Sequence, residues 1–441
     1  GIFIVVLIQN LGFSPLLYGV IAFIPRFFDA ITDPVMGFIS DNTKSKWGKR
    51  RQYVFLGAII MGISFITMWQ LYIENGIVFN FWYFLFFSLI FYLGLTIFSI
   101  PFVAMGYEMS DDFHERTKIM AVSQFIGQFA WIIAPWIWVI IYDPNIFSDP
   151  ASGTRELSIY IGIACTLFAI TPALFIKSKS TLDDKNLAPL TRKTLGSSFT
   201  NIFSLFKDAY KNEPFRKLCM ATFLIFNSFQ TIAAFSFFII VHYLFSGDAA
   251  AAGIWPTLHG SIGALITTIL VIPLVSKMAQ RYGKKYTFIL SQSISIIGYI
   301  LFWFLFIPGK PYMFLYALPF FSFGIGGLFT IMMSMTADVC DYEELKNGLP
   351  RREGAFGAIY WWMVKLGTAL AGLFAGIIMW YVGFAPDAVT QPEGALTGLR
   401  FFYTFIPITG TSLAIYVMWD YDIDEKRAEE IKAELLIKNN S

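Results

Sequence analysis

Residues 23–38, FIPRFFDAITDPVMGF, place three charged side chains inside a longer apolar run. Arg26, Asp29 and Asp33 are spaced i, i+3 and i+7, so they share one face of a helix. A charge at the bilayer centre costs about 2.5 to 3.5 kcal/mol on insertion scales, and charges there indicate a function. Two carboxylates one turn apart repel each other unless a cation or a proton is shared between them. The stretch therefore predicts a cation-binding pair.

Two neighbours add oxygen atoms to this pair. Pro34 has no N–H, so the carbonyl oxygen of Ala30 is left without its helical hydrogen bond and is available to a ligand. Thr32 supplies a hydroxyl oxygen on the same turn. Hard cations prefer such oxygen ligands. The alternative interpretation is structural, with Asp29 paired to Arg26 and the charges serving only to tie helices together.

A second base, Lys365, lies deep in the apolar run AIYWWMVKLGTALAGLFAG, too far from either interface to reach water easily. We expect it to face the two acids when no cation is bound, or to donate hydrogen bonds to a polar solute. Several uncharged residues within the expected spans could line a solute cavity, namely Thr96, Ser99, Gln124, Tyr360 and Trp361. The alternative for each of them is plain packing or a single interhelical hydrogen bond.

The composition places these charges in a membrane protein. Of the 441 residues, 56% are hydrophobic and only 14% are charged, whereas a soluble domain carries about 25% charged residues. The apolar runs are too long for the alternating strands of an outer-membrane barrel, and helices satisfy every backbone group in lipid. We therefore expect an all-α membrane protein.

Windows of about 20 residues predict eleven full membrane spans. The apolar residues 1–11 are too short to cross a bilayer and are interpreted as the tail of a truncated first helix, which gives twelve spans in two six-helix halves. The expected domains are an N-terminal half at 1–176, a cytoplasmic linker with an amphipathic helix at 177–217, a C-terminal half at 218–419 and a cytoplasmic tail at 420–441. The full spans are expected near 15–40, 53–72, 82–103, 119–142, 158–176, 218–243, 254–276, 287–306, 313–337, 354–382 and 399–419.

Basic residues mark the cytoplasmic side of a membrane protein. Most of the 32 Lys and Arg fall in alternate loops and in the tail, and the opposite loops hold only Arg155, Lys310 and Arg400. This distribution predicts that both termini lie in the cytoplasm and that the chain is an integral protein of the plasma (inner) membrane.

The two halves echo each other in sequence. Trp47-Gly48-Lys49 after the second span recurs as Tyr282-Gly283-Lys284 after the eighth, and Glu108 with Arg116 is echoed by Asp341 with Arg351. An internal repeat of two six-span halves is typical of major-facilitator transporters, and chance likeness between short basic loops is the alternative. We expect charged residues of the inner loops to form contacts that open and close during transport. These gate candidates are Asp41, Lys49, Arg50, Arg51, Glu108, Arg116, Asp338, Asp341, Arg351 and Arg352.

Other chemistry lacks its required residues. The sequence contains no HExxH, GxxxxGK[ST], GxSxG or CxxC pattern, so it does not predict a metalloprotease, an ATP-driven pump or a hydrolase. The basic clusters have no aromatic platform of the kind that binds nucleic acid. We expect no enzyme activity, no cofactor and no nucleic-acid partner.

The quoted motif and two further stretches resemble the glycoside, pentoside and hexuronide cation symporters, the melibiose permease family. They are RFFDAITDPVMGFISDNTKSKWGKRR from Arg26, IPFVAMGYEMSDDFHERTKIMA from Ile100, and ADVCDYEELKNGLPRREGAFGAIYWWMVKLG from Ala337. The resemblance covers both halves. It implies a major-facilitator fold and cation-coupled transport of a sugar or glycoside.

The resemblance also implies roles for particular residues. It places a Na+, Li+ or H+ site on Asp29 and Asp33, with help from Thr96 and from Thr32, which replaces the Asn of melibiose permease. Arg26 matches the arginine before the acids, and Lys365 matches a lysine near the cation and sugar sites.

The chain departs from melibiose permease where that protein binds sugar. Ser99 replaces a sugar-binding Asp, and Gln124 replaces a sugar-contacting Arg. Galactoside recognition is therefore not implied, and an acidic sugar such as a hexuronide is one candidate solute.

The sequence as a whole predicts a monomeric symporter in the lipid bilayer that works by alternating access, with a small solute bound between the halves. Three other interpretations stay open. The same fold could carry a lysolipid or another organic solute, or it could act as a passive facilitator. A membrane scaffold or enzyme would give no reason for the four buried charges.

Overall fold

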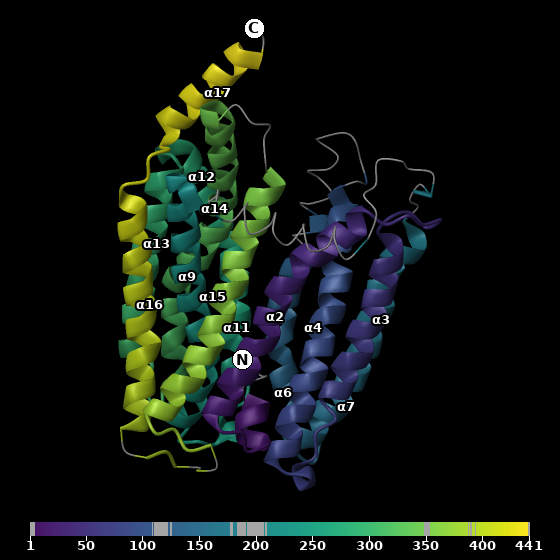
Figure 1. The fold of residues 1–441 in the computed structure, drawn as a ribbon. Coiled ribbons are helices and arrows are strands. Elements are labelled where there is room, and N and C mark those ends of the chain that lie inside the picture. The colour runs from purple at the N-terminus through teal and green to yellow at the C-terminus, as the bar shows by residue number, and fades with distance from the viewer. Residues whose placement is uncertain are drawn as a thin grey trace. The chain divides into compact units, whose positions relative to one another are not determined.

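The computed structural model describes residues 5–107, 126–176, 210–347, 353–386 and 394–439, with positions 109, 122, 123, 180–182, 191, 207, 388 and 390–392. All regular structure in these residues is helical (Figure 1). The long helices are α2 (Pro15–Asp41), α3 (Arg51–Met68), α4 (Ile77–Tyr107), α7 (Pro150–Phe175), α9 (Glu213–Phe238), α11 (Trp255–Ile266), α12 (Ile272–Tyr282), α13 (Lys284–Leu305), α14 (Leu318–Asn347), α15 (Glu353–Tyr381), α16 (Ala395–Trp419) and α17 (Glu425–Asn439).

The described part of the chain contains ten helices that are long and apolar enough to cross a membrane, and a shorter apolar helix at Ile126–Ile141. Each of these helices overlaps one of the eleven expected spans, and the expectation of an all-helical membrane protein is confirmed. Residues 1–11 contribute a π-helical turn at Val6–Asn10. The expected amphipathic helix of the 177–217 linker lies largely outside the described residues.

Contacts divide the chain into two units, which differ slightly from the expected halves. The α2–α7 unit comprises residues 6–130 and 140–204, and the α9–α17 unit comprises 1–5, 131–139 and 205–441. In the first unit, α3 packs against α4 and α7, and α2 packs against α4. In the second, α13 packs against α14 and α16, and α12 packs against α14. The same order of helix pairs thus occurs twice, as an internal repeat predicts.

The turns that precede α3 and α13 also share a backbone conformation. Gly48 and Gly283 both have a φ of 79°, in the left-handed region that glycine adopts most readily. These are the two glycines that the sequence echo aligns.

Residues 131–139 belong by their contacts to the α9–α17 unit, although they lie within the expected fifth span. Pro135 interrupts their helix with a 3-10 turn, because it lacks the N–H that the α-helix needs. The hydroxyls of Thr257 and Ser261 on α11 donate to the carbonyls of Pro135 and Ile132 at 2.9 and 2.6 Å. Side chains of α11 thus hydrogen-bond to the backbone around the break.

A glycine allows the close approach of α3 and α4. A Cβ atom added at Gly57 would lie 2.5 Å from the backbone nitrogen of Phe98, closer than any real contact of this kind. Gly94 of α4 is equally confined, with a Cβ position 2.7 Å from the nitrogen of Met61. Both helices therefore pack backbone against backbone, as small residues permit in membranes.

We expect Gly57→Ala to lower the stability of the purified protein by about 1 to 3 kcal/mol, because the helices must separate to admit a methyl group. Gly127→Ala is the matched control, since nothing lies within 4 Å of its Cβ position. Thermal unfolding in detergent should give a lower melting temperature for Gly57→Ala alone. Equal melting temperatures for the two variants would show that the α3–α4 contact is looser than described.

The expected tail at 420–441 contains a helix that we did not predict. In α17, Ala428, Ile431 and Leu435 are spaced i, i+3 and i+7, and all three are buried in the core of the α9–α17 unit. Helix α17 packs on α14. The tail is thus a docked element of this unit.

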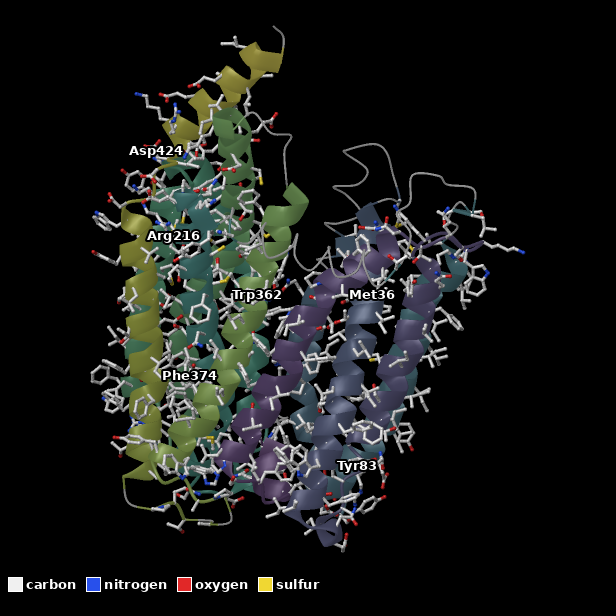
Figure 2. All side chains as sticks on the ribbon, in the orientation of Figure 1. Met36, Tyr83, Arg216, Trp362, Phe374 and Asp424 are labelled. Atoms are coloured by element: carbon white, nitrogen blue, oxygen red, sulfur yellow. The ribbon has the colours of Figure 1, made fainter. Side chains whose placement is uncertain are left out.

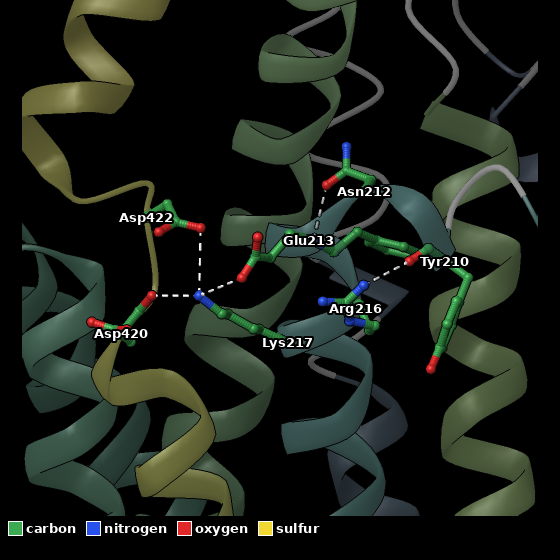
Figure 3. Close-up of polar contacts among 8 residues, drawn as sticks. Tyr210, Asn212, Glu213, Arg216, Lys217, Asp420 and Asp422 are labelled. Carbon is green, nitrogen blue, oxygen red and sulfur yellow. Dashed lines mark hydrogen bonds and ion pairs between the residues drawn. The ribbon is translucent and has the colours of Figure 1, made fainter.

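Lys217 of α9 holds the segment that leads into α17. Its Nζ donates to the carbonyl of Asp420 at 2.5 Å and lies 3.4 Å from the carboxylate of Asp422 and 3.2 Å from that of Glu213 (Figure 3). Arg216 and Asp424 lie at this same end of the unit, with Phe374 farther along it (Figure 2). Charged contacts therefore fix the segment at one end, and apolar burial fixes the helix that follows.

Candidate functional site

Asp29, Thr32 and Asp33 of α2 meet Thr96 of α4 in a carboxylate–hydroxyl cluster. The Oγ1 of Thr96 lies 2.7 Å from Oδ1 of Asp29 and 3.1 Å from Oδ1 of Asp33. The Oγ1 of Thr32 lies 3.1 Å from the same Thr96 oxygen. The structure thus brings together the four residues expected to bind the cation, all within the α2–α7 unit.

The helical geometry of α2 builds one side of the cluster. The hydroxyl of Thr32 is 3.1 Å from the carbonyl of Asp29 and 3.2 Å from that of Phe28, which is the usual bond of a helical threonine to the preceding turn. Its lone pairs remain available on the side of Thr96. Pro34 lies inside the helix, as expected.

The cluster concentrates negative charge in a buried place. Asp29 is 4% exposed and Thr96 is 1% exposed, whereas Asp33 is half-buried. One hydroxyl has a single hydrogen, so Thr96 donates to only one of the two carboxylates at a time. Two carboxylates around one oxygen repel each other strongly where water is scarce, and a cation, a proton or a basic side chain relieves this repulsion.

The donor set of the cluster consists of carboxylate and hydroxyl oxygens. Such a set suits Na+ or Li+ and does not resemble the nitrogen and sulfur sites of zinc or copper. Among the described residues, no group of three or more His, Cys, Asp or Glu could hold a metal ion.

The other expected site residues are spread over both units. Arg26 is half-buried one turn before Asp29, and Ser99 is half-buried one turn after Thr96. Lys365 is half-buried on α15, in the α9–α17 unit. Gln124 lies outside the described residues.

The two aromatic candidates on α15 differ in their surroundings. Tyr360 is fully buried in the hydrophobic core of its unit, so it offers no surface to a solute in this conformation. Trp361 is 43% exposed, and its ring packs edge-on against Tyr360 at 5.8 Å between centroids.

The gate candidates of the α2–α7 unit contact residues of their own unit. The guanidinium of Arg50 pairs with the carboxylate of Asp41 at 2.6 Å. Arg51 donates to the carbonyls of Ala173 and Leu174 at 2.8 and 3.3 Å, and so caps the end of α7. Lys49 is half-buried.

In the α9–α17 unit, Asp338 is a buried carboxylate with two basic neighbours. Lys284 Nζ lies 2.5 Å from Oδ2 of Asp338, and Lys432 of α17 lies 3.7 Å from Oδ1. Burial raises the pKa of the nearby Tyr421 hydroxyl well above its ordinary value, and the negative charges of Asp338 and Asp422 raise it further. Asp341 is buried as well.

Lys284 and Lys432 were not among the expected gate residues. The gate candidates outside the described residues are Glu108, Arg116, Arg351 and Arg352.

The burial of Asp338 leads to a stability prediction. We expect Asp338→Asn to destabilise the protein by about 2 kcal/mol, because the neutral amide leaves the Lys284 charge without an anionic partner. Asp41→Asn removes an ion pair whose acid is 54% exposed and should cost less than about 1 kcal/mol. Melting temperatures in detergent compare the two variants. A larger loss for Asp41→Asn would contradict this ranking.

Two units with repeated helix pairs and membrane-length apolar helices are the organisation of the major facilitator fold. The family model described as MFS/sugar transport protein matches residues 5–425, and the chain belongs to that family. This match confirms the family resemblance of the sequence motifs. It also makes the chain a transporter and not an enzyme.

Proteins of similar sequence are known from bacteria. The glucuronide carrier protein homolog of Escherichia coli (strain K12) is 25% identical over 425 residues, which cover 95% of this chain and 86% of that protein. The isoprimeverose transporter of Lactiplantibacillus pentosus is 22% identical over 434 residues, which cover 94% and 82%. A crystal structure of a mutant of the nucleoside transporter NupG has a TM-score of 0.63 at 14% identity, over 94% of each chain. At that identity the structural likeness shows the fold alone.

Proposed function

We propose that the protein is a symporter that couples a sugar or glycoside to a cation by alternating access. The observation that carries the proposal is the carboxylate–hydroxyl cluster, in which one Thr96 oxygen lies within 3.1 Å of both Asp29 and Asp33. A passive facilitator has no use for a buried acid pair, whereas a symporter must bind its coupling ion in the membrane. The family match supports the sugar as solute.

The cluster gives the coupling ion its role in the cycle. Oxygen ligands suit Na+ or Li+, and the same carboxylates can take a proton. Either ion cancels a negative charge and so lowers the cost of keeping two acids in a low-dielectric site. A membrane potential adds about 2.3 kcal/mol per charge per 100 mV to the driving force for uptake.

The solute is proposed to be a neutral or acidic sugar. Relatives named for a glucuronide and for isoprimeverose represent the two classes. Lys365 is half-buried, and its ammonium group would attract the carboxylate of a hexuronide. Ser99 is a candidate hydrogen-bonding group for either class. We further propose a monomer in the plasma (inner) membrane with both termini in the cytoplasm.

Transport by reconstituted protein tests this function. Proteoliposomes are supplied with labelled neutral or acidic glycosides, with an inward Na+ gradient, an inward H+ gradient or no gradient. We expect at least one glycoside to accumulate above its external concentration only under an inward cation gradient. Equilibration at the same rate with all gradients collapsed by ionophores would identify a passive facilitator instead.

A further inference from the structure

The surface of α12 and α13 carries a groove that the transport site does not use. It has a volume of about 520 Å³ and lies where the end of α12 meets the first turns of α13. It belongs to the α9–α17 unit, whereas the carboxylate–hydroxyl cluster belongs to the α2–α7 unit. The groove is lined by Tyr282, Tyr286, Thr287, Ile289, Leu290 and Ser293.

The groove continues into the lipid-facing side of α13. Tyr286, Leu290 and Ser293 are exposed, and the exposed side chains of Ile297, Ile300 and Phe304 follow at the same helical spacing. An exposed apolar stripe on a membrane-spanning helix contacts acyl chains, because no water is present at that depth. A lipid chain can therefore run along α13 from the groove towards Phe304.

Tyrosines and bases gather at the other end of the groove. Tyr282 and Tyr286 are 53% and 65% exposed, and tyrosine favours the level of the lipid headgroups. Lys277 and Arg281 lie one turn apart on α12, and Lys285 follows the turn at Gly283. The Arg281 guanidinium lies 5.3 Å from the centre of the Tyr282 ring.

The charge balance at this end is positive. Asp338 is already paired with Lys284. Glu425 is the acidic neighbour, with a carboxylate oxygen 3.6 Å from the Cβ position of Gly283. Within the described residues, no carboxylate lies within ion-pair distance of Lys277, Arg281 or Lys285. Three bases thus fall within nine residues of sequence at this end of the groove, with Glu425 as an acidic neighbour.

We propose that this groove binds an anionic phospholipid of the cytoplasmic leaflet. The phosphate lies near Arg281 and Lys285, the tyrosine hydroxyls donate to headgroup oxygens, and one acyl chain follows Leu290 and Ile297. A zwitterionic lipid fits the apolar part equally well but gains less from the bases, since each Lys or Arg near a membrane surface favours anionic lipid. The assignment to the cytoplasmic leaflet rests on the orientation proposed above, and the binding itself does not.

Native mass spectrometry of the full chain in detergent tests the proposal with dioleoyl-phosphatidylglycerol and dioleoyl-phosphatidylcholine as probes. We expect the wild type to retain phosphatidylglycerol about tenfold more tightly than phosphatidylcholine. Arg281→Gln/Lys285→Gln should remove this preference. Lys44→Gln/Lys46→Gln is the matched control, because it removes two exposed bases from the other unit and should keep the preference.

A steric variant and a free headgroup analogue distinguish the binding of a lipid from the binding of a small anion. Ser293→Phe fills the groove without changing the charge and should weaken retention of phosphatidylglycerol. Glycerol 3-phosphate should not displace the lipid, because it has no acyl chain to occupy the groove. Equal losses in the two charge variants would overturn the proposal, since retention would then follow total charge. Wild-type retention by Ser293→Phe, or displacement by glycerol 3-phosphate, would also overturn it.

Discussion

Replacing Asp29 by Asn is expected to reduce the initial rate of cation-driven solute uptake about a hundredfold, because it removes a buried carboxylate from the coupling site. Loss of one partner from a buried charged set costs about 3 kcal/mol, and each 1.4 kcal/mol is a factor of ten in affinity. Asp29 is 4% exposed and accepts the shortest bond of the cluster, at 2.7 Å from Thr96. Initial uptake rates in proteoliposomes under a fixed inward cation gradient measure the effect.

Glu74→Gln is the control for Asp29→Asn. It also removes one negative charge from the α2–α7 unit, but Glu74 is exposed in the 3-10 turn Ile73–Asn75 between α3 and α4 and should tolerate the change. Both variants should melt close to the wild-type temperature. Unchanged cation-dependent accumulation by a folded Asp29→Asn protein would mean that the coupling ion binds elsewhere.

Replacing Thr96 by Val is expected to raise the cation concentration for half-maximal uptake about tenfold. Valine keeps the shape of threonine but lacks the hydroxyl that lies within 3.1 Å of both carboxylates. A hydrogen bond to a charged group contributes about 1.5 to 3 kcal/mol, which corresponds to a tenfold change or more. Titration of uptake with the coupling cation gives the value.

Thr96→Ser is the matched variant, since it restores the hydroxyl on a smaller side chain. We expect it to recover most of the cation affinity lost in Thr96→Val. Wild-type cation affinity in Thr96→Val, which keeps the methyl group and lacks only the hydroxyl, would show that the hydroxyl does not belong to the cation site.

The cation pair was predictable because its members share one helix. The spacing of Asp29 and Asp33 alone places them on one face of α2. Thr96 is 67 positions from Asp29, so residue spacing could not place it beside the acids, and only the family resemblance indicated it. The geometry of the cluster depends on how α2 packs against α4.

The ends of helices and the partners of charged residues were harder to predict from the sequence. Helix α14 extends to Asn347, beyond the expected end of the span at 337, because hydropathy marks the bilayer and not the end of helical backbone. The pairing of Asp338 with Lys284 joins residues 54 positions apart, through the packing of α13 on α14. The burial of Tyr360 likewise depends on which face of α15 meets the core, and a helix apolar on all sides does not reveal this.

Solute-driven cation entry tests the central claim most directly. Proteoliposomes hold equal cation concentrations inside and outside, and only an inward gradient of a transported glycoside is imposed. We predict that the wild type carries the coupling cation inward with the solute, measured as labelled Na+ uptake or as internal acidification, and that Asp29→Asn does not. Solute entry by the wild type without movement of either cation would contradict symport through the carboxylate–hydroxyl cluster.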